Sequence, residues 1–153
     1  MLKTLEWISS YESGIIEQDN QHKHIIGIIN GIYAYFQINL THQIDIGKFN
    51  TIIDSLIEEY ENHFKIEEAI MESLLYPHTE VHKKEHFKIS LILDNFKKNI
   101  KKKQKIEVIQ FLEFVNNWLF DHLNIDDLEF IKWYKLQDNG DKNGRNEEIE
   151  MRR

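Results

Sequence analysis

Four stretches of this chain carry apolar side chains at alternating steps of three and four positions. Because an α-helix completes a turn about every 3.6 residues, this spacing gathers those side chains on one helical face. The sequence therefore predicts four amphipathic helices, and its single proline leaves room for them to be long. Their stripes consist of His22, Ile25, Ile29, Ile32 and Phe36; Phe49, Ile53, Leu56, Tyr60, His63, Glu67, Ile70 and Leu74; His82, His86, Ile89, Leu93, Phe96 and Ile100; and Val108, Leu112, Val115, Leu119 and His122.

Short breaks separate the four stretches, at about residues 39–45, at Pro77 and at residues 101–105. Four amphipathic helices joined by short connections pack most simply with alternating directions. We therefore predict an all-α, up-down-up-down four-helix bundle over residues 1–136, with the residues before the first helix laid over it as an N-terminal arm. Residues 137–153 have little to bury, so the sequence predicts a disordered polar tail.

The composition fits one folded domain without thiol chemistry. With 153 residues, 41% of them apolar, the chain suffices for one ordinary core. It has no cysteine, which excludes disulfides, iron–sulfur clusters and cysteine-based zinc sites. A net charge of −7 argues against binding to nucleic acid or to an anionic membrane. No apolar run is long enough to span a membrane and the first residues lack a signal-peptide core, so we expect a cytoplasmic protein.

The polar members of the stripes are the informative feature. Five of the eight histidines and one glutamate fall at positions that the helical spacing assigns to the core. Burying so many polar groups in a small bundle costs several kcal/mol unless a partner satisfies them, and a bound metal is such a partner. The core set is His22, His63, Glu67, His82, His86 and His122, whereas His24, His42 and His78 are expected on the surface or in loops.

A seventh donor is expected just after the fourth stripe. Asp126 lies four residues past His122 and Asp127 lies five residues past it, where a regular helix turns it away from the histidine. The apolar stripe also continues one residue late, which favours a π-bulge that turns Asp127 back inward. Asp126 is the alternative ligand, because it keeps the regular spacing.

Five imidazoles and two carboxylates are more than one zinc ion takes, and calcium and magnesium prefer oxygen ligands. Such a set suits two first-row metal ions that share the carboxylates, and iron fits best. The chain lacks the Glu-x-x-His pairs of carboxylate-rich di-iron proteins. A histidine-rich centre favours reversible binding of oxygen over its activation.

The order of these motifs resembles the hemerythrin family in its bacterial single-domain form. The resemblance runs from Trp7 to about Tyr134 and includes Asp19-Asn20-Gln21-His22-Lys23, His63-Phe64, Glu67-Glu68 with Met71, and Trp118-Leu119 before His122. It implies that one iron ion is bound by His82, His86 and His122 and the other by His22 and His63, with Glu67, Asp127 and an oxo or hydroxo group as bridges. The second iron then keeps an open position, where dioxygen binds.

The resemblance also implies an apolar wall that keeps water from the open iron. We therefore expect a non-enzymatic protein whose partner is dioxygen and which carries, stores or delivers it. The alternatives are an oxygen or redox sensor, which needs a separate output partner, and a di-iron redox protein that protects against oxidative damage. The implied wall consists of Ile25, Phe64, Trp118, Leu119 and Leu123.

Overall fold

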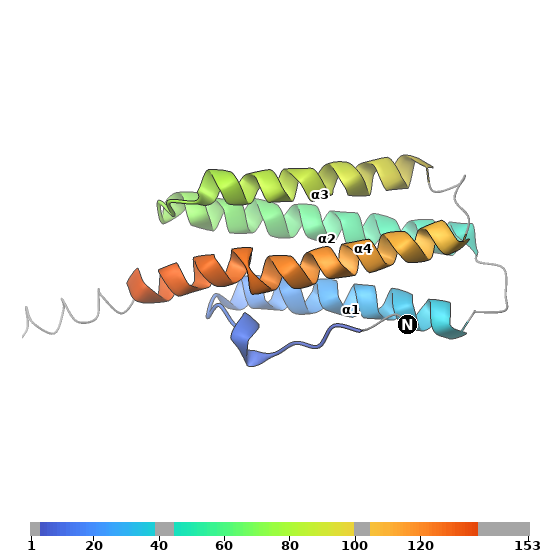
Figure 1. Ribbon diagram of the computed structural model, residues 1–153, viewed down its shortest axis with the longest axis horizontal. Helices are drawn as coiled ribbons and strands as arrows, with labels where there is room; N and C mark the ends of the chain where they lie inside the picture. The colour runs from blue at the N-terminus through green and yellow to red at the C-terminus, as the bar shows by residue number, and fades with distance from the viewer. Residues whose placement is uncertain (1–3, 39–44, 100–104, 138–153) are drawn as a thin grey trace, which may run out of the picture.

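The computed structural model describes residues 4–38, 45–99 and 105–137. Four helices lie side by side with alternating directions, so the predicted all-α up-down-up-down bundle is confirmed (Figure 1). A helical segment at 126–137 continues the line of the fourth helix after a turn at Ile125. The labelled elements are the short 3-10 helix η1 (Ser9–Tyr11) and the α-helices α1 (Ile16–Ile38), α2 (Ile46–Ser73), α3 (Thr79–Asn99) and α4 (Lys105–Asn124).

The core lies between the four helices and is built from the predicted stripes. Ile29, Leu56, Ile89 and Leu112, one from each helix, are fully buried. Burial of such side chains stabilises the fold by about 1.5–3 kcal/mol each, which holds the four helices in register around the interior of the bundle. The Phe36 side chain and Ile100 fall outside the described residues, as do His42 and the tail from residue 138 on.

The end of α2 departs from the predicted stripe. Leu74 is exposed, because it is the C-cap residue of α2 and the chain turns away there. Leu75 adopts a left-handed φ of 55°, and the Tyr76 N–H bonds to the Met71 carbonyl at 2.9 Å, which closes a Schellman motif. The core at this end of the bundle is formed instead by Met71, Tyr76 and Phe130.

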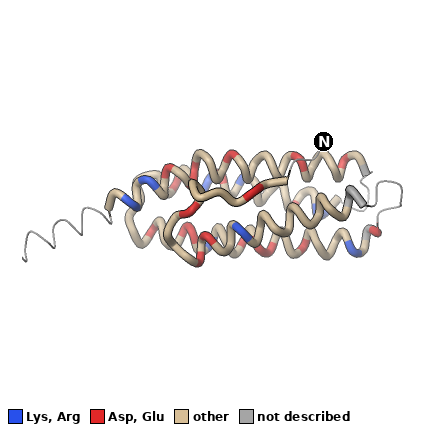
Figure 2. Tube along the Cα trace, turned by 90° about the horizontal axis from the view of Figure 1, so that it is seen from below, with Lys and Arg blue, Asp and Glu red and all other residues tan. Residues whose placement is uncertain are grey.

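The residues before α1 form the predicted arm, which lies over the bundle and runs along it (Figure 2). The Leu5 N–H donates to Asn30 Oδ1 of α1 at 3.1 Å, and Asn30 Nδ2 donates back to the Leu5 carbonyl at 2.8 Å. Leu5 and Tyr11 are buried in the core cluster. The arm is therefore docked by a reciprocal pair of hydrogen bonds and by apolar contacts.

Charged residues are spread along the helices. In the view of Figure 2, Lys and Arg positions are interspersed with Asp and Glu positions. Lys97 and Lys98 lie exposed in the last turn of α3, where the helix dipole favours positive charge, and Lys97 pairs with Asp54 at 2.8 Å. No helix in the described part of the chain combines the length and the apolar character of a membrane span.

Candidate metal centre

All seven predicted donor residues come together inside the bundle. Helix α1 contributes one, α2 two, α3 two, α4 one, and the segment 126–137 the last. Each is at most 4% exposed, and among the described residues they form two overlapping groups of possible metal ligands. The first group is Glu67, His82, His86 and His122, and the second is His22, His63, Glu67 and Asp127.

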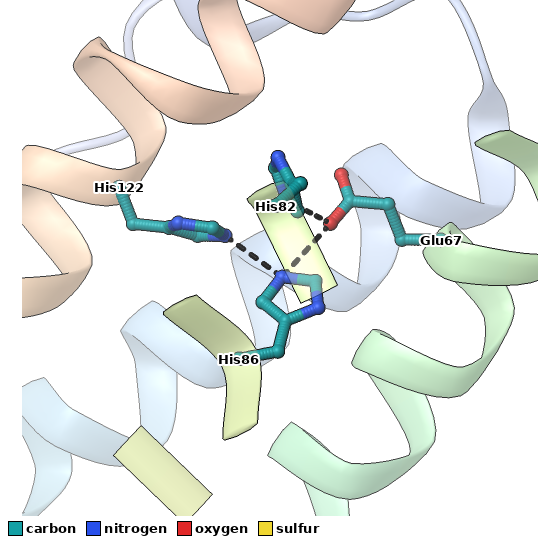
Figure 3. Close-up of side chains that lie close together, drawn as sticks. All are labelled: Glu67, His82, His86 and His122. Atoms are coloured by element: carbon teal, nitrogen blue, oxygen red, sulfur yellow. Dashed lines mark hydrogen bonds and ion pairs between the residues drawn. The ribbon is translucent and has the colours of Figure 1, made fainter. Parts of the chain in front are cut away.

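The first group gathers three imidazoles from two helices around one carboxylate (Figure 3). His82 Nε2 lies 3.0 Å and His86 Nε2 3.3 Å from Glu67 Oε2. His122, from α4, approaches from the other side and brings its Nε2 to 3.1 Å from His86 Nε2. The four donor atoms therefore surround one point, with three nitrogens and an oxygen directed at it.

The second group has one imidazole fewer. His22 Nε2 and His63 Nε2 lie 3.0 Å apart, and His63 Nε2 lies 3.7 Å from Glu67 Oε2. Because Glu67 belongs to both groups, the two halves of the centre share an edge. We call them the three-histidine half and the two-histidine half.

Asp127 joins the two halves through different oxygens. Its Oδ1 lies 3.0 Å from His122 Nε2 and 3.4 Å from His82 Nε2, in the three-histidine half. Its Oδ2 lies 3.1 Å from His22 Nε2, in the two-histidine half. This arrangement suits a carboxylate that bridges two metal ions.

A break in the helix turns Asp127 inward, although its form differs from the predicted π-bulge. The Ile125 N–H still bonds to the Asp121 carbonyl at 2.9 Å, after which α4 ends and the hydrogen-bond ladder restarts with the Glu129 N–H on the Ile125 carbonyl. The interruption is thus a one-residue turn. Its effect is the expected one, because the Asp127 side chain is fully buried.

Asp126, the alternative ligand, lies outside the centre. Its side chain is 36% exposed, and its Oδ2 lies 3.1 Å from His122 Nδ1, the nitrogen that faces away from the other donors. The structure therefore places Asp127 among the donors and Asp126 behind one of them.

The surroundings of both carboxylates favour their ionised form. Burial and the neighbouring Asp127 carboxylate raise the pKa of Glu67, but its combined contacts with the surrounding histidines, foremost the hydrogen bonds from His82 and His86, hold that pKa below its ordinary value. Burial likewise opposes ionisation of Asp127, yet its contacts with His122 hold the pKa of its carboxyl well below the ordinary value. Two negative charges are thus held in the interior of the bundle.

The imidazoles differ according to what they face. Burial lowers the pKa of His63 to about 3, so this ring is neutral and its Nε2 offers a lone pair. Burial also disfavours the charged form of His122, but the neighbouring Asp127 carboxylate raises the pKa of His122 to about 10. In the metal-free chain the charged form of His122, with a hydrogen on both ring nitrogens, is therefore favoured, and a metal ion that binds Nε2 displaces the hydrogen there.

The geometry fits a pair of metal ions. Two nitrogens bound at right angles to one metal, each about 2.0–2.1 Å from it, lie about 3 Å apart. His22 Nε2 and His63 Nε2 are 3.0 Å apart, and His86 Nε2 and His122 Nε2 are 3.1 Å apart. Among the described residues, both Asp127 oxygens are buried without a well-formed hydrogen bond, which a metal ion would satisfy.

Comparison with known proteins agrees with this geometry. The family model of the Hemerythrin HHE cation binding domain matches residues 13–134. The chain belongs to the hemerythrin family. The bacteriohemerythrin of Clostridium acetobutylicum is 31% identical over 129 residues, which cover 82% of this chain and 97% of that protein. The bacteriohemerythrins of Pseudomonas paraeruginosa and Stenotrophomonas maltophilia are 28% and 26% identical, over 83% and 80% of this chain and 79% and 76% of theirs.

A loop before α1 fixes the start of this hemerythrin fold. Asp19 Oδ1 accepts hydrogen bonds from the Ser13 N–H and the Ser13 hydroxyl, both at 2.8 Å, and Asp19 Oδ2 accepts from the Gly14 N–H at 3.3 Å. Gly14 has a φ of 85°, which a side chain would strain. The Asp19 carboxylate thereby closes the loop one turn before His22 and sets the register of α1.

Two residues at the hemerythrin centre escaped the sequence-based prediction. Gln18 is fully buried, and its Nε2 donates a hydrogen bond to Glu67 Oε1, the oxygen that does not face the histidines. Trp7, from the arm, lies against His22 with ring centroids 6.2 Å apart. Gln18 lies four residues before His22, so extending the first stripe backwards by one turn finds it; no comparable signal points to Trp7.

Four of the five residues of the implied apolar wall belong to one buried core cluster, and Trp118, which is partly buried, packs against it. Phe64 stacks on His86 with centroids 3.9 Å apart, and Trp118 stacks on His122 at 4.5 Å. Both rings therefore lie against ligands of the three-histidine half, while Phe64 also reaches His63 at 5.6 Å. The surroundings of the centre are thus apolar and aromatic on the α2 and α4 sides.

Two of the three remaining histidines lie where the sequence predicts. His24 is 61% exposed and pairs with Glu59 at 3.3 Å. His78 is 58% exposed, in the connection between α2 and α3. Neither belongs to the two donor groups.

A buried set of histidines and carboxylates in a hemerythrin-family domain is suited to bind non-haem iron.

Proposed function

We propose that this chain holds two iron ions in the buried centre and binds dioxygen reversibly, as a carrier, store or delivery protein. The observation that carries the proposal is the convergence of five imidazole Nε2 atoms on two buried carboxylates that link the two halves. Iron suits a mixed nitrogen and oxygen donor set of this kind. Two such ions, with an oxo or hydroxo group between them, would supply the two electrons that dioxygen binding requires.

The chain would hold the two ions unequally. His82, His86 and His122 provide three imidazoles in one half, and His22 and His63 provide two in the other, with Glu67 and Asp127 common to both. The two-histidine half therefore has one protein donor fewer. This supports an open position for dioxygen in that half.

The residues around the centre would keep water out. Ile25, Leu119 and Leu123 are buried to within 1% of full burial. Trp7 covers the His22 side, and Gln18 holds the outer oxygen of Glu67. Water and protons promote irreversible oxidation of the irons by oxygen, so a dry, apolar surrounding that keeps them out supports reversible binding.

Reversibility tests the proposal directly. Iron analysis of the purified protein should give two irons per chain. The fully reduced protein should gain a visible absorption band on exposure to air and lose it when oxygen is removed. Prompt and irreversible oxidation would overturn the carrier role and favour the redox sensor or the protective protein, and absence of iron would overturn the centre itself.

Leu119→Ala is expected to shorten the lifetime of the oxygenated protein several-fold. Leu119 lies one turn before His122 and is 1% exposed, so its truncation leaves room for water close to the centre. The rate of autoxidation is measured as the rate at which the visible band decays in air. Leu112→Ala is the matched control, because Leu112 is equally buried two turns earlier on α4. Both variants should lose about 2–5 kcal/mol of stability, and equal autoxidation rates would contradict a role for Leu119 in excluding water.

A further inference from the structure

The five imidazoles of the centre all point inward through Nε2, so Nδ1 of each ring faces away from it. For Nε2 to offer a lone pair to a metal ion, the ring hydrogen must sit on Nδ1. What accepts that hydrogen determines how strongly the ring donates. A carboxylate acceptor makes the imidazole a stronger ligand and fixes its orientation, whereas a neutral acceptor does so less.

The three-histidine half has carboxylate acceptors behind two of its rings. His86 Nδ1 lies 2.8 Å from Glu68 Oε1, and His122 Nδ1 lies 3.1 Å from Asp126 Oδ2. The Glu68 side chain is 25% exposed and that of Asp126 is 36% exposed, so both carboxylates retain contact with water. They therefore escape the cost of full burial while they hold buried rings.

The two-histidine half lacks this support. His63 Nδ1 lies 3.3 Å from Gln21 Oε1, which is a neutral amide oxygen at a longer distance. His22 Nδ1 is buried without a hydrogen-bond partner among the described residues. The two halves therefore differ in the groups behind their histidines as well as in the number of those histidines.

We propose that Glu68 and Asp126 are positioning residues that make the three-histidine half the tighter metal site, so that it fills first and the two-histidine half fills second. This rests on the proposed function, in that the seven donors hold two ions. The order of filling follows from the donors. The three-histidine half has three imidazoles, two of which have a carboxylate behind them, whereas the two-histidine half has two imidazoles, one with a neutral acceptor and one with none. Metal loading of the centre is then stepwise, and the half with the open position is also the half that loses its metal most readily.

Solvent can reach the Glu68 side chain from outside the bundle. Glu68 lines a groove of about 690 Å³ between α2 and α3, together with Phe64 and His86. Solvent therefore reaches the outer side of the His86–Glu68 pair without entering the centre. A substitution at Glu68 changes a water-accessible carboxylate and leaves the apolar core in place.

The test is an anaerobic titration of the metal-free chain with Co²⁺. The visible absorption of the bound ion reports how much metal has bound at each step. The unaltered protein should bind two equivalents in two resolved steps. His22→Ala should abolish the weaker step and keep the tighter one. Glu68→Gln and Asp126→Asn should each weaken the tighter step by about 10–100-fold, the usual cost of removing a partner behind a metal ligand, and leave the weaker step unchanged.

Glu72→Gln is the matched control for Glu68→Gln. Glu72 lies one turn further along α2, lines the same groove and pairs with Lys83 at 2.7 Å rather than with a histidine. It should leave both steps unchanged. Denaturant unfolding of each metal-free variant shows whether the chain still folds, and the two carboxylates lie on different elements, so either variant alone is informative.

The outcomes separate the two proposals. If the unaltered chain binds fewer than two equivalents, the proposed function fails. If it binds two equivalents with equal affinity, or if Glu68→Gln and Asp126→Asn weaken both steps or neither, the centre stands and the role of the two carboxylates is overturned.

Discussion

Asp127→Asn is expected to reduce the metal content from two ions to one or fewer per chain and to abolish the visible band of the oxygenated protein. Asp127 directs Oδ1 at His122 Nε2, 3.0 Å away, and Oδ2 at His22 Nε2, 3.1 Å away. The amide of asparagine has one oxygen in place of two, so at least one half loses a donor. The amide is also neutral, so the centre loses one of two negative charges that compensate the cations.

Iron analysis and the absorption spectrum measure this effect. Asp121→Asn serves as its control, because Asp121 lies exposed on α4, one residue before His122, and its substitution removes the same charge. It should retain two irons and the full band. A preparation of Asp127→Asn with two irons per chain and an unchanged band would show that this carboxylate does not bridge the metals.

The sequence pattern predicts the fold because the four stripes are long and regular. Four long amphipathic helices joined by short connections bury their apolar faces most simply as an antiparallel bundle, and most stripe positions that the structure describes are buried. The exceptions are Ile70, which is partly buried, and Leu74, which is exposed where the helix ends. Periodicity says where a helix can bury a face, but whether Leu75 takes a left-handed φ and closes the helix depends on how the turn to α3 is made.

The donor set follows from the same pattern and from the cost of burial. His63 with Glu67 and His82 with His86 could be predicted because each pair lies at helical spacing within an apolar stripe. Asp127 could not be fixed that way, because a regular helix favours Asp126. The helix break at Ile125 decides between them, and its signal in the sequence, the one-residue delay of the apolar stripe, does not determine the form of the break.

The groups behind the donors are the part that the sequence does not reveal. Gln18 meets Glu67 across 49 positions of chain, and Trp7 reaches His22 from an arm with no periodic pattern. Glu68 reads as a solvated acid on a helix face. Its contact with His86 depends on the distance between α2 and α3 and on side-chain rotamers, which spacing along one helix does not determine.

Removal of the metals is expected to lower the melting temperature by roughly 15–30 °C. Without cations the chain keeps five imidazoles and two carboxylates in its interior, each at most 4% exposed, at a cost that hydrogen bonds offset only in part. An ion present at a thousand times its dissociation constant adds about 4 kcal/mol of stability, so two ions add about 8 kcal/mol. In a chain of this size each kcal/mol shifts the melting temperature by about 2–4 °C.

Thermal unfolding followed by circular dichroism, with and without exhaustive chelation, measures the shift. His24→Ala is the control, because His24 is 61% exposed and outside both donor groups, so it should show the same difference between metal-bound and metal-free protein. His82→Ala should show a smaller difference, since the ring that it removes contacts both Glu67 and Asp127. A shift below about 5 °C in the unaltered chain would mean that the ions add little to a centre already held by its own hydrogen bonds, because two ions bound even at a hundred times their dissociation constants add about 5 kcal/mol.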